Sequence, residues 1–303
     1  MNNKIKMESP LFSVLIANFN NGHYIDEAIG SVISQSYTNW EIIIVDDDST
    51  DNSWEIITKF AETYPYIRCY QNAKNLKVGA TKARATSLAK GQICAILDPD
   101  DKLVPTALEK QVKCYLEDSN CSMVSSKYYI CDEVFNINGI NTDVYKPEQN
   151  YSYLASLGGI NAFWTFKKEK YDLTRGFKTK YYLAEDQDLY YQLEEVGAVK
   201  VINEPLYYYR IHKNSISKND NLATAYAYHL LAMFEAKNRR PKNKLESEAI
   251  KKAFMHFMTW GIMKIKKKMR LQLFGKIAIH FPQLFSKKII INGLWGVIKV
   301  NYE

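Results

Sequence analysis

The sequence predicts an α/β fold: a mostly parallel sheet flanked by helices, followed by a C-terminal helical extension. Short apolar runs alternate with stretches of helical periodicity over the first 115 residues, which is typical of βαβ units. Acidic clusters directly follow two of the apolar runs. With 303 residues, 47% hydrophobic and 24% charged, the chain has a globular composition, which excludes disordered, collagen-like and disulfide-scaffold classes.

The first 115 residues supply four apolar runs and three helical stretches. Each run is short and ends in polar turn residues, as a buried strand does. Gly91 is the expected stop of the third helical stretch. The expected strands are residues 12–17, 41–45, 67–71 and 92–97, and the expected helices are residues 24–35, 53–63 and 79–90.

The rest of the chain changes character twice. Residues 120–165 are rich in aromatics and predict irregular strands and loops, followed by a helix over 184–196 and a strand over 199–209. From about Asn221 the pattern is helical and basic, without repeats. We therefore expect one domain over residues 1–219, with halves at about 11–115 and 116–219, and a basic helical region over 220–303.

The net charge of +7 is unevenly placed. Residues 237–303 hold 16 Lys and Arg against 3 Glu, or +13, which leaves −6 for residues 1–236. An acidic body disfavours nucleic acid as the main ligand, whereas a basic tail rich in Phe, Ile, Met and Trp suits an anionic phospholipid surface.

The sequence predicts a cytoplasmic protein, placed at the inner face of the membrane if the tail binds lipid. The first residues lack the apolar stretch of a secretory signal, and no apolar window reaches the 18 or so residues that a membrane-spanning helix needs. The five cysteines are odd in number and without a C-x-x-C pair, as expected of reduced, buried thiols.

Two acidic turns carry the strongest chemical signal. Asp98, Asp100 and Asp101 follow an expected strand within four residues, and such hard oxygen ligands suit Mg²⁺ or Mn²⁺ bridging to a diphosphate. A solvated turn before a helix is the alternative, and for this turn alone it would be favoured. However, residues 46–48 are also three aspartates after an expected strand, and parallel strands bring both turns to one edge, where ligands of such sheets bind.

Other α/β classes fit less well. A dinucleotide-binding dehydrogenase needs G-x-G-x-x-G after its first strand, where this chain has Asn18-Phe19-Asn20-Asn21-Gly22. A receiver domain would end near residue 120 and needs a lysine after a later strand.

Taken together, the patterns resemble family 2 glycosyltransferases, which are inverting enzymes of the GT-A fold. The similarity covers about residues 11–218, and the order and spacing of its pieces are specific. The pieces that carry it are Val14–Asn20, Glu27–Val32 with Gln35-Ser36-Tyr37, Trp40–Asp51, Leu97–Asp101, Ala184–Leu189 and Tyr209-Arg210-Ile211-His212.

The resemblance implies transfer of a sugar from a nucleoside-diphosphate sugar, of the UDP-sugar type, to a hydroxyl of a glycan or lipid-linked acceptor in surface polysaccharide or glycolipid assembly. It implies Mn²⁺ or Mg²⁺ as cofactor. The family often has Pro-Thr-Tyr-Asn where this chain has residues 17–20, and Arg-Asn where it has Lys82-Ala83, so the donor pocket is altered. The residues so assigned are Ala17, Asn18 and Phe19 for the nucleotide, Asp47 for the base, Lys82 for a phosphate, Asp98 and Asp100 for the ribose and sugar, and Asp100, Asp101 and His212 for the metal.

By the same resemblance Asp186 is the catalytic base, because an attacking hydroxyl must lose its proton to a carboxylate within hydrogen-bond reach. Acidic residues also favour the first turn of any helix, so residues 185–188 have a plain structural alternative. Glu185 and Trp164 are placed on the acceptor side, although core packing explains Trp164 equally well.

Two alternatives to a glycosyltransferase remain for the function, and two interpretations remain for the basic tail. A sugar-phosphate nucleotidyltransferase would need a Gly-rich loop after the first strand, and a catalytically silent sugar- or lipid-binding module would lack Asp186 or Asp101. In the tail, apolar residues at helical spacing from Ile250 to Met269 lie among lysines. They indicate either an interfacial membrane helix or a helix packed on the catalytic domain with a solvated basic face.

Overall fold

The computed structural model describes residues 9–147, 152–156, 160, 162–179, 183–213, 221–280 and 282. The chain forms two compact units. The sheet unit comprises Met1–Lys146, Ile160–Phe177 and Val196–Ile211, and the helical unit comprises Pro147–Gly159, Lys178–Glu195 and His212–Glu303.

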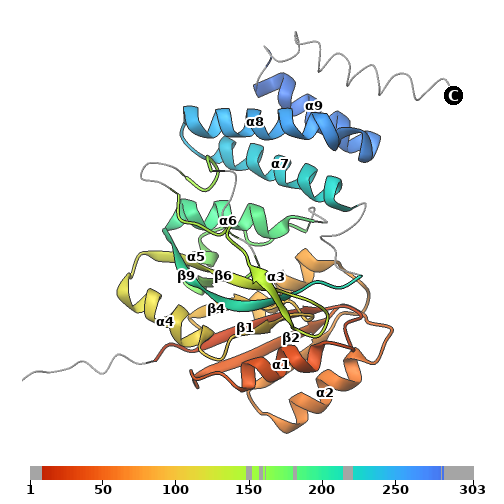
Figure 1. Cartoon of the computed structure of the whole chain (residues 1–303), viewed down its shortest axis with the longest axis vertical. Coiled ribbons are helices and arrows are strands. Elements are labelled where there is room, and N and C mark those ends of the chain that lie inside the picture. The colour runs from red at the N-terminus through yellow and green to blue at the C-terminus, as the bar shows by residue number, and fades with distance from the viewer. Residues whose placement is uncertain are drawn as a thin grey trace, which may run out of the picture. The chain divides into compact units, whose positions relative to one another are not determined.

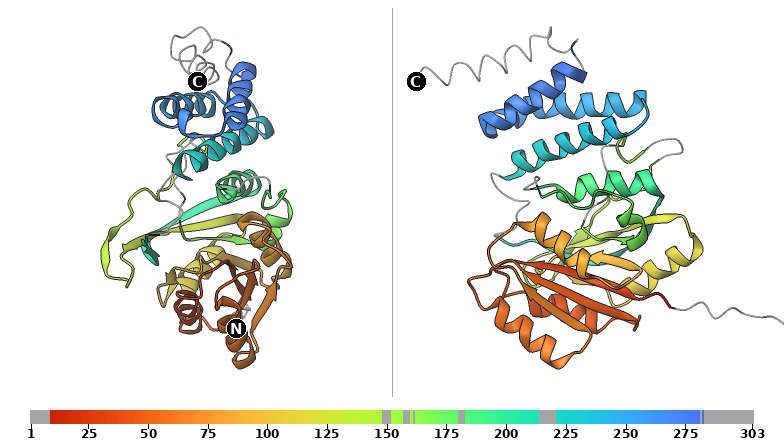
Figure 2. Two further views of the ribbon diagram at one scale, coloured as in Figure 1. Left: turned by 90° about the vertical axis from the view of Figure 1, so that its right-hand side faces the viewer. Right: turned by 180° about the vertical axis from the view of Figure 1, so that it is seen from behind.

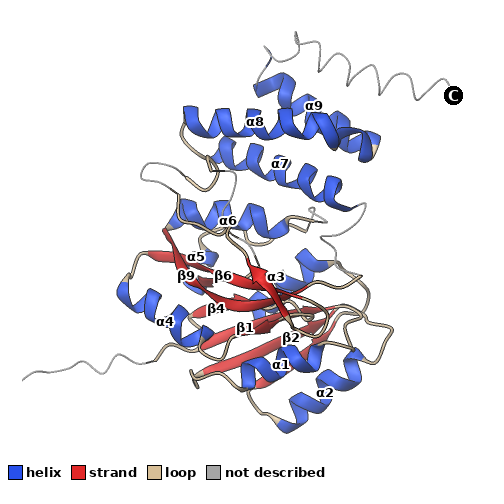
Figure 3. Cartoon of the chain, viewed as in Figure 1, coloured by secondary structure: helices blue, strands red, loops and turns tan. Residues whose placement is uncertain are grey.

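The sheet unit has the α/β architecture that the sequence predicts, with helices flanking a curled sheet (Figures 1 and 3). Its described residues form a nine-stranded sheet of order β3-β2-β1-β4-β8-β6-β9-β5, with β7 paired to β6. The first four strands are β1 (Phe12–Asn18), β2 (Trp40–Asp46), β3 (Ile67–Gln71) and β4 (Ile93–Ile96), connected by α1 (Ile25–Ile33), α2 (Ser53–Thr63) and α3 (Val78–Leu88).

These four strands are parallel, as expected, so their carboxyl ends share one edge. β1 pairs with β2 from Phe12 opposite Trp40 to Asn18 opposite Asp46, and with β4 on its other side. The near-continuous apolar runs of β1, β2 and β4 are buried because helices cover both faces of a parallel sheet, whereas the edge strand β3 is mostly half-buried.

The second half of the sheet contains a longer strand than the sequence predicts, although the pairing of this strand shifts register at several points, as expected of irregular strands. Within residues 120–165, β6 is an unbroken run of 11 residues that pairs with β9 in parallel and with β8 antiparallel. Its partners lie far along the chain, so local periodicity does not reveal it. The elements of this half are β5 (Lys102–Leu103), α4 (Ala107–Glu117), β6 (Cys121–Cys131), β7 (Ile137–Ile140), β8 (Trp164–Lys167), α5 (Lys168–Asp172) and β9 (Ala198–Arg210).

The described part of the helical unit contains helices and loops but no strand (Figure 2). The expected helix over 184–196 is present, and the basic region after residue 221 is helical as predicted. None of the helices described is long and apolar enough to cross a membrane. The elements are α6 (Glu185–Val196), α7 (Asn221–Arg239), α8 (Lys244–Trp260), the short 3₁₀ helix η1 (Ile262–Lys264) and α9 (Lys267–His280).

The apolar residues between Ile250 and Met269 do not belong to one helix. α8 ends at Gly261, where a Cβ atom would lie 2.1 Å from the Phe257 ring. Ile250, Phe254 and Phe257 are fully buried, with Phe257 stacked against Tyr226 of α7 at 5.4 Å between ring centroids. The apolar face of α8 is therefore covered by α7 and α9 of its own unit, so these residues pack within the tail rather than on the residues expected to form the catalytic domain.

Candidate functional site

The ends of β1 and β2 are joined directly at the carboxyl edge of the sheet. The backbone N–H of Asp47 donates to the carbonyl of Asn18 at 2.8 Å, and the Asn18 amide donates to Asp46 Oδ1 at 2.8 Å. Asp46 and Asn18 are fully buried, whereas the Phe19 ring is 44% exposed. Asn18 is thus a structural tie, and Phe19 presents an aromatic face that a base can stack on.

Asp47 is a buried carboxylate that organises the loop before α3. Its Oδ1 accepts from the Asn72 amide at 2.6 Å and from the Leu76 N–H at 2.8 Å, and its Oδ2 accepts from the Lys77 N–H at 2.8 Å. A carboxylate has about four acceptor positions, so one remains for a ligand. Lys77 has a left-handed backbone with φ +74°. Lys82 lies on α3, which begins directly after this loop, and is buried. Asp47, the residue predicted to bind the base, therefore also holds the loop that leads into α3.

The second acidic turn follows β4 at the same edge. Asp98 and Asp100 are half-buried, while Asp101 is 1% exposed. Asp101 Oδ1 accepts the Arg210 N–H at 2.7 Å, and Oδ2 is buried without a hydrogen-bond partner among the described residues. Burial, and then the charges of Asp100 and Asp98, raise the pKa of Asp101 well above its usual range.

Arg210 is a site residue to which the sequence assigned no role, although it stands in the Tyr-Arg-x-His pattern. It is 3% exposed; its Nε donates to the Asp100 carbonyl and its Nη1 to the Glu133 carbonyl, both at 2.7 Å. Its Nη2 pairs with Glu27 of α1. The guanidinium therefore ties the acidic turn to α1 and to the β6–β7 connection.

The acidic turn fits a divalent cation by the chemistry of its donors. Mg²⁺ is held by one or two carboxylates plus substrate phosphates rather than by an all-protein cage, and Asp98 and Asp100 supply accessible hard oxygens. The partnerless Asp101 Oδ2 is a further oxygen whose burial a cation would compensate. Among the described residues no three His, Cys, Asp or Glu side chains form a preassembled metal cluster.

The predicted base lies in the helical unit, at the start of α6. Asp186 is partly exposed; its Oδ1 accepts the Gln187 N–H at 2.8 Å, and its Oδ2 accepts from the Tyr190 hydroxyl at 3.4 Å. Glu185 beside it is 5% exposed. Ala184, just before the helix, has φ +63°, a backbone that costs a non-glycine residue about 1–2 kcal/mol and that tends to occur at functional sites.

The structure thus divides the predicted residues. Asn18, Asp47 and the turn from Asp98 to Asp101 come together at one edge of the sheet unit, whereas Asp186 and Glu185 belong to the helical unit. His212 is 7% exposed and follows Arg210 by two residues, at the point where the chain enters the helical unit.

Trp164 does not present a face to an acceptor. It is 2% exposed on β8 and stacks on Phe166 at 5.4 Å between ring centroids, with Phe177 at 6.2 Å. The structure supports the core-packing interpretation, because stacking on these rings and burial in the sheet unit leave no room for a sugar.

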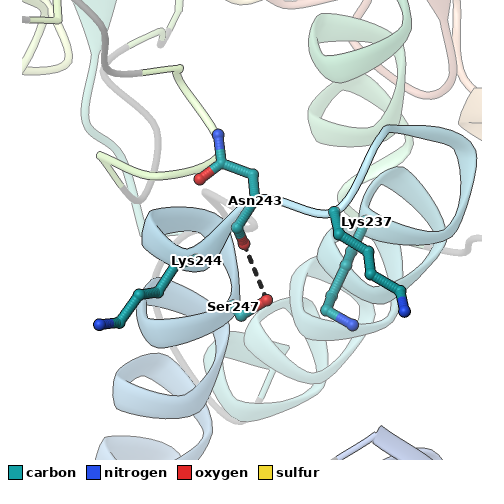
Figure 4. Close-up of a pocket in the computed structure, with 5 residues that line it drawn as sticks. Lys237, Asn243, Lys244 and Ser247 are labelled. Atoms are coloured by element: carbon teal, nitrogen blue, oxygen red, sulfur yellow. Dashed lines mark hydrogen bonds between the residues drawn. The ribbon is translucent and has the colours of Figure 1, made fainter.

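A cavity of about 370 Å³ lies in the helical unit, between the end of α7 and the start of α8. Figure 4 shows Lys237 and Lys244 on opposite sides of Asn243, whose carbonyl accepts from the Ser247 hydroxyl at 2.9 Å. No residue assigned to donor, metal or base lines it.

Comparison with known proteins agrees with this geometry. The family described as "Glycosyl transferase family 2" matches residues 13–174. The chondroitin synthase of Pasteurella multocida (strain Pm70) is 31% identical over 233 residues, which are 76% of this chain and 24% of that synthase. The chain therefore spans about a quarter of the length of this relative.

A relative of similar size matches along most of its length. The UDP-Glc:alpha-D-GlcNAc-diphosphoundecaprenol beta-1,3-glucosyltransferase WfaP of Escherichia coli is 35% identical over 213 residues, 69% of this chain and 80% of that enzyme. Among solved structures, S. aureus TarS 1–349 in complex with UDP-GlcNAc has a TM-score of 0.67 at 17% identity, covering 89% of this chain and 80% of that one, which shows the shared fold. On this evidence the chain belongs to glycosyl transferase family 2.

Proposed function

We propose that the protein transfers a sugar from a nucleoside-diphosphate sugar, of the UDP-sugar type, to a hydroxyl of a glycan or lipid-linked acceptor, with inversion at the anomeric carbon. The observation that carries the proposal is the meeting of Asp47, Phe19 and the turn from Asp98 to Asp101 at the carboxyl edge of the parallel strands. That edge is where α/β sheets bind nucleotides. Surface polysaccharide or glycolipid assembly is the setting, by analogy with the bacterial relatives.

In this reaction the sheet unit holds the donor. The exposed ring of Phe19, beside Ala17, stacks on the base, and the remaining acceptor position of Asp47 takes the base N–H, as uracil N3–H would donate. Lys82 offers a point charge to a phosphate, and Asp98 and Asp100 bind the ribose and the sugar.

The helical unit supplies the proton acceptor. The acceptor hydroxyl attacks the anomeric carbon while the bond from that carbon to the diphosphate oxygen breaks, and the diphosphate leaves with the electron pair. Asp186 takes the hydroxyl proton at its carboxylate, and Glu185 contributes to the acceptor side. Residues 1–219, which include α6 of the helical unit, would then form the catalytic domain, and residues 220–303 an accessory helical region.

Asp100, Asp101 and His212 are the residues that would hold Mn²⁺ or Mg²⁺. Bound there, a divalent cation offsets the charge of the departing diphosphate. Asp101 would join this set by its buried carboxylate, one oxygen of which accepts the Arg210 N–H.

The test is a panel of nucleotide sugars incubated with the protein and Mn²⁺, with release of nucleoside diphosphate as the measurement. We expect release from one donor or a few, abolished by excess chelator and restored by added Mn²⁺. Full activity in chelator would overturn the metal assignment. Release from no donor, with and without a glycan acceptor, would overturn the function.

The stereochemistry is tested separately. With an α-linked donor, NMR of the product should give a β linkage, and an α linkage would contradict inversion.

We also propose a peripheral contact with an anionic membrane, made by η1 and α9. No carboxylate occurs from residue 249 to 302, and the side chains of Met263, Leu271 and Ile279 are 50%, 54% and 75% exposed. Each Lys or Arg near an anionic leaflet contributes about 1 kcal/mol, and exposed apolar side chains add burial at the interface. The cations of this surface are Lys264, Lys266, Lys267, Lys268, Arg270 and Lys276.

Flotation with phosphatidylserine vesicles tests this contact. We expect the protein to float at low salt, and the pair Lys267→Glu with Lys268→Glu to reduce the floated fraction. Lys90→Glu with Lys113→Glu makes the same charge change on the sheet unit and should leave flotation unchanged. Equal loss in both pairs, or no flotation of the unaltered protein, would exclude this surface.

A further inference from the structure

We propose that Arg239, the last residue of α7, is a positioning residue for Asp186, acting through the buried carboxylate of Asp188. The inference rests on the proposed function, because it takes Asp186 as the base. It extends that function to a helix beyond the stretch that matches the family, residues 13–174.

Asp188 lies in the first turn of α6, two residues after Asp186, and is fully buried. Its Oδ1 pairs with Arg239 Nη1 at 3.2 Å, and its Oδ2 pairs with Lys178 Nζ at 2.9 Å and accepts from the Gln192 amide at 2.8 Å. A buried carboxylate is costly unless it is paired and hydrogen-bonded. The position of the first turn of α6 is therefore set by Arg239 and Lys178, the two cations that pair with Asp188.

Arg239 also grips the last turn of α6. Its Nε lies 2.9 Å from one carboxylate oxygen of Glu195 and its Nη2 lies 3.0 Å from the other, which is the two-pronged geometry that only a guanidinium provides. The same side chain thus contacts both ends of the helix and fixes its rotation about its axis.

Arg240 strengthens this connection without touching the first turn. Its Nη2 donates to the Tyr191 carbonyl at 2.7 Å and pairs with Glu194 at 2.9 Å, and its Nη1 pairs with Glu246 of α8 at 2.9 Å. α6 is therefore attached to α7 and α8 by ion pairs, of which those of Asp188, Glu194 and Glu246 are partly buried and those of Glu195 lie near the surface, and it is grouped with them in the helical unit.

The consequence for Asp186 follows from helix geometry. Its own hydrogen bonds, to the Gln187 N–H and the Tyr190 hydroxyl, are both within α6, so its direction follows the orientation of the helix. A shift of about 1 Å in a reacting group can cost about 100-fold in rate. Loss of Arg239 would leave Asp188 undercompensated and allow the first turn to move.

The experiment compares Arg239→Met and Arg239→Lys in the full chain, measuring kcat for transfer and the Kd for the nucleoside diphosphate. We expect Arg239→Met to lower kcat by about 10- to 100-fold with an unchanged Kd, because the residues proposed to bind the nucleotide lie in the sheet unit. Arg239→Lys keeps the charge and should recover part of the lost kcat. Arg68→Met is the matched control: it breaks the Arg68–Glu41 pair of the sheet unit at 2.8 Å and should leave kcat unchanged below the melting temperature.

A double-mutant cycle with Asp188→Asn tests the route. If Arg239 acts through Asp188, the double variant Asp188→Asn with Arg239→Met loses no more kcat than the more damaging of the two single variants; full additivity would overturn the route. An unchanged kcat in Arg239→Met, or parallel loss of kcat and nucleotide binding, would overturn the proposal. Asp186→Asn, measured in parallel, separates the two ideas: if it keeps its activity the base assignment fails, and if it is inactive while Arg239→Met is normal only the positioning role fails.

Discussion

At the scale of single residues, the buried carboxylates of Asp47, Asp101 and Asp188 are each compensated differently. Asp47 accepts two backbone N–H groups and an amide, Asp188 pairs with two cations, and Asp101 accepts one backbone N–H. Burial and the charges of Asp100 and Asp98 raise the pKa of Asp101. The best compensated carboxylates hold structure, and the least compensated one is the candidate for a cation.

Asp47→Asn should weaken nucleotide binding by about tenfold or more, because an amide cannot accept all three bonds and each lost buried bond costs about 1–3 kcal/mol. The loop from Asn72 to Lys77 would loosen at the same time. Isothermal titration with UDP and hydrogen exchange of residues 75–77 are the measurements. Asp48→Asn, at an exposed neighbour, is the control, and equal binding by both variants would remove Asp47 from the donor site.

His229 predicts a pH-dependent stability. It is half-buried, with its Nε2 2.7 Å from the Tyr191 hydroxyl, and its removal from water lowers its pKa from 6.5 to about 4. The unfolded chain takes up this proton below pH 6.5 and the folded one only near pH 4, so its contribution is complete above pH 6.5 and is lost as the pH falls toward 4.

The size of this effect is about 3 kcal/mol. Urea unfolding at pH 7 and pH 5 should give a fall in stability for the unaltered protein that His229→Gln reduces. His256→Gln, at an exposed histidine of α8, should leave the fall intact. A pH dependence that survives in His229→Gln would contradict the neutral histidine.

At the scale of elements, two glycines that look alike in sequence have opposite roles. A Cβ atom at Gly91, before β4, would lie 2.6 Å from Ser13 Oγ and 2.7 Å from the Leu11 carbonyl, whereas nothing lies within 4 Å of one at Gly30 in α1. Gly91 is therefore required by the close approach of β1, and Gly30 is not required by packing.

Gly91→Ala should lower the free energy of unfolding by about 1–3 kcal/mol through overpacking. Gly30→Ala should raise it by about 0.5–1 kcal/mol, because alanine loses less backbone entropy in a helix. Denaturant unfolding of the two variants provides the comparison. A Gly91→Ala variant more stable than the unaltered protein would contradict the requirement for glycine beside β1.

Helix periodicity alone overstated one element. The apolar spacing from Ile250 to Met269 continues past Gly261, but the Phe257 ring occupies the space beside that glycine and α8 ends there. The spacing indicates which side chains are buried. It does not show that these side chains belong to two separate helices.

At the scale of the whole molecule, what the sequence predicts well is local. β1 to β4 and their helices follow from apolar runs and turn residues, and the two acidic turns meet at one edge because the strands are parallel. The rest depends on distant partners: β6 needs β8 and β9, Trp164 is buried by residues of other segments, and Asp188 meets Arg239 from 51 positions away. No local pattern contains such pairings.

The residues proposed for donor binding and for proton removal belong to different units of the molecule. The residues assigned to the donor belong to the sheet unit, whereas the assigned base belongs to a helix that is bound by ion pairs to the C-terminal helices. Donor binding and proton removal should therefore respond separately to substitution.

The most direct test measures nucleotide affinity and turnover side by side in Asp186→Asn, which keeps the shape of the side chain and removes the proton acceptor. If Asp186 is the base, turnover of this variant should be about 10²- to 10⁴-fold lower, with UDP bound as tightly as by the unaltered protein. Turnover within a few-fold of normal, or a loss of UDP binding that accounts for the lower rate, would contradict this assignment.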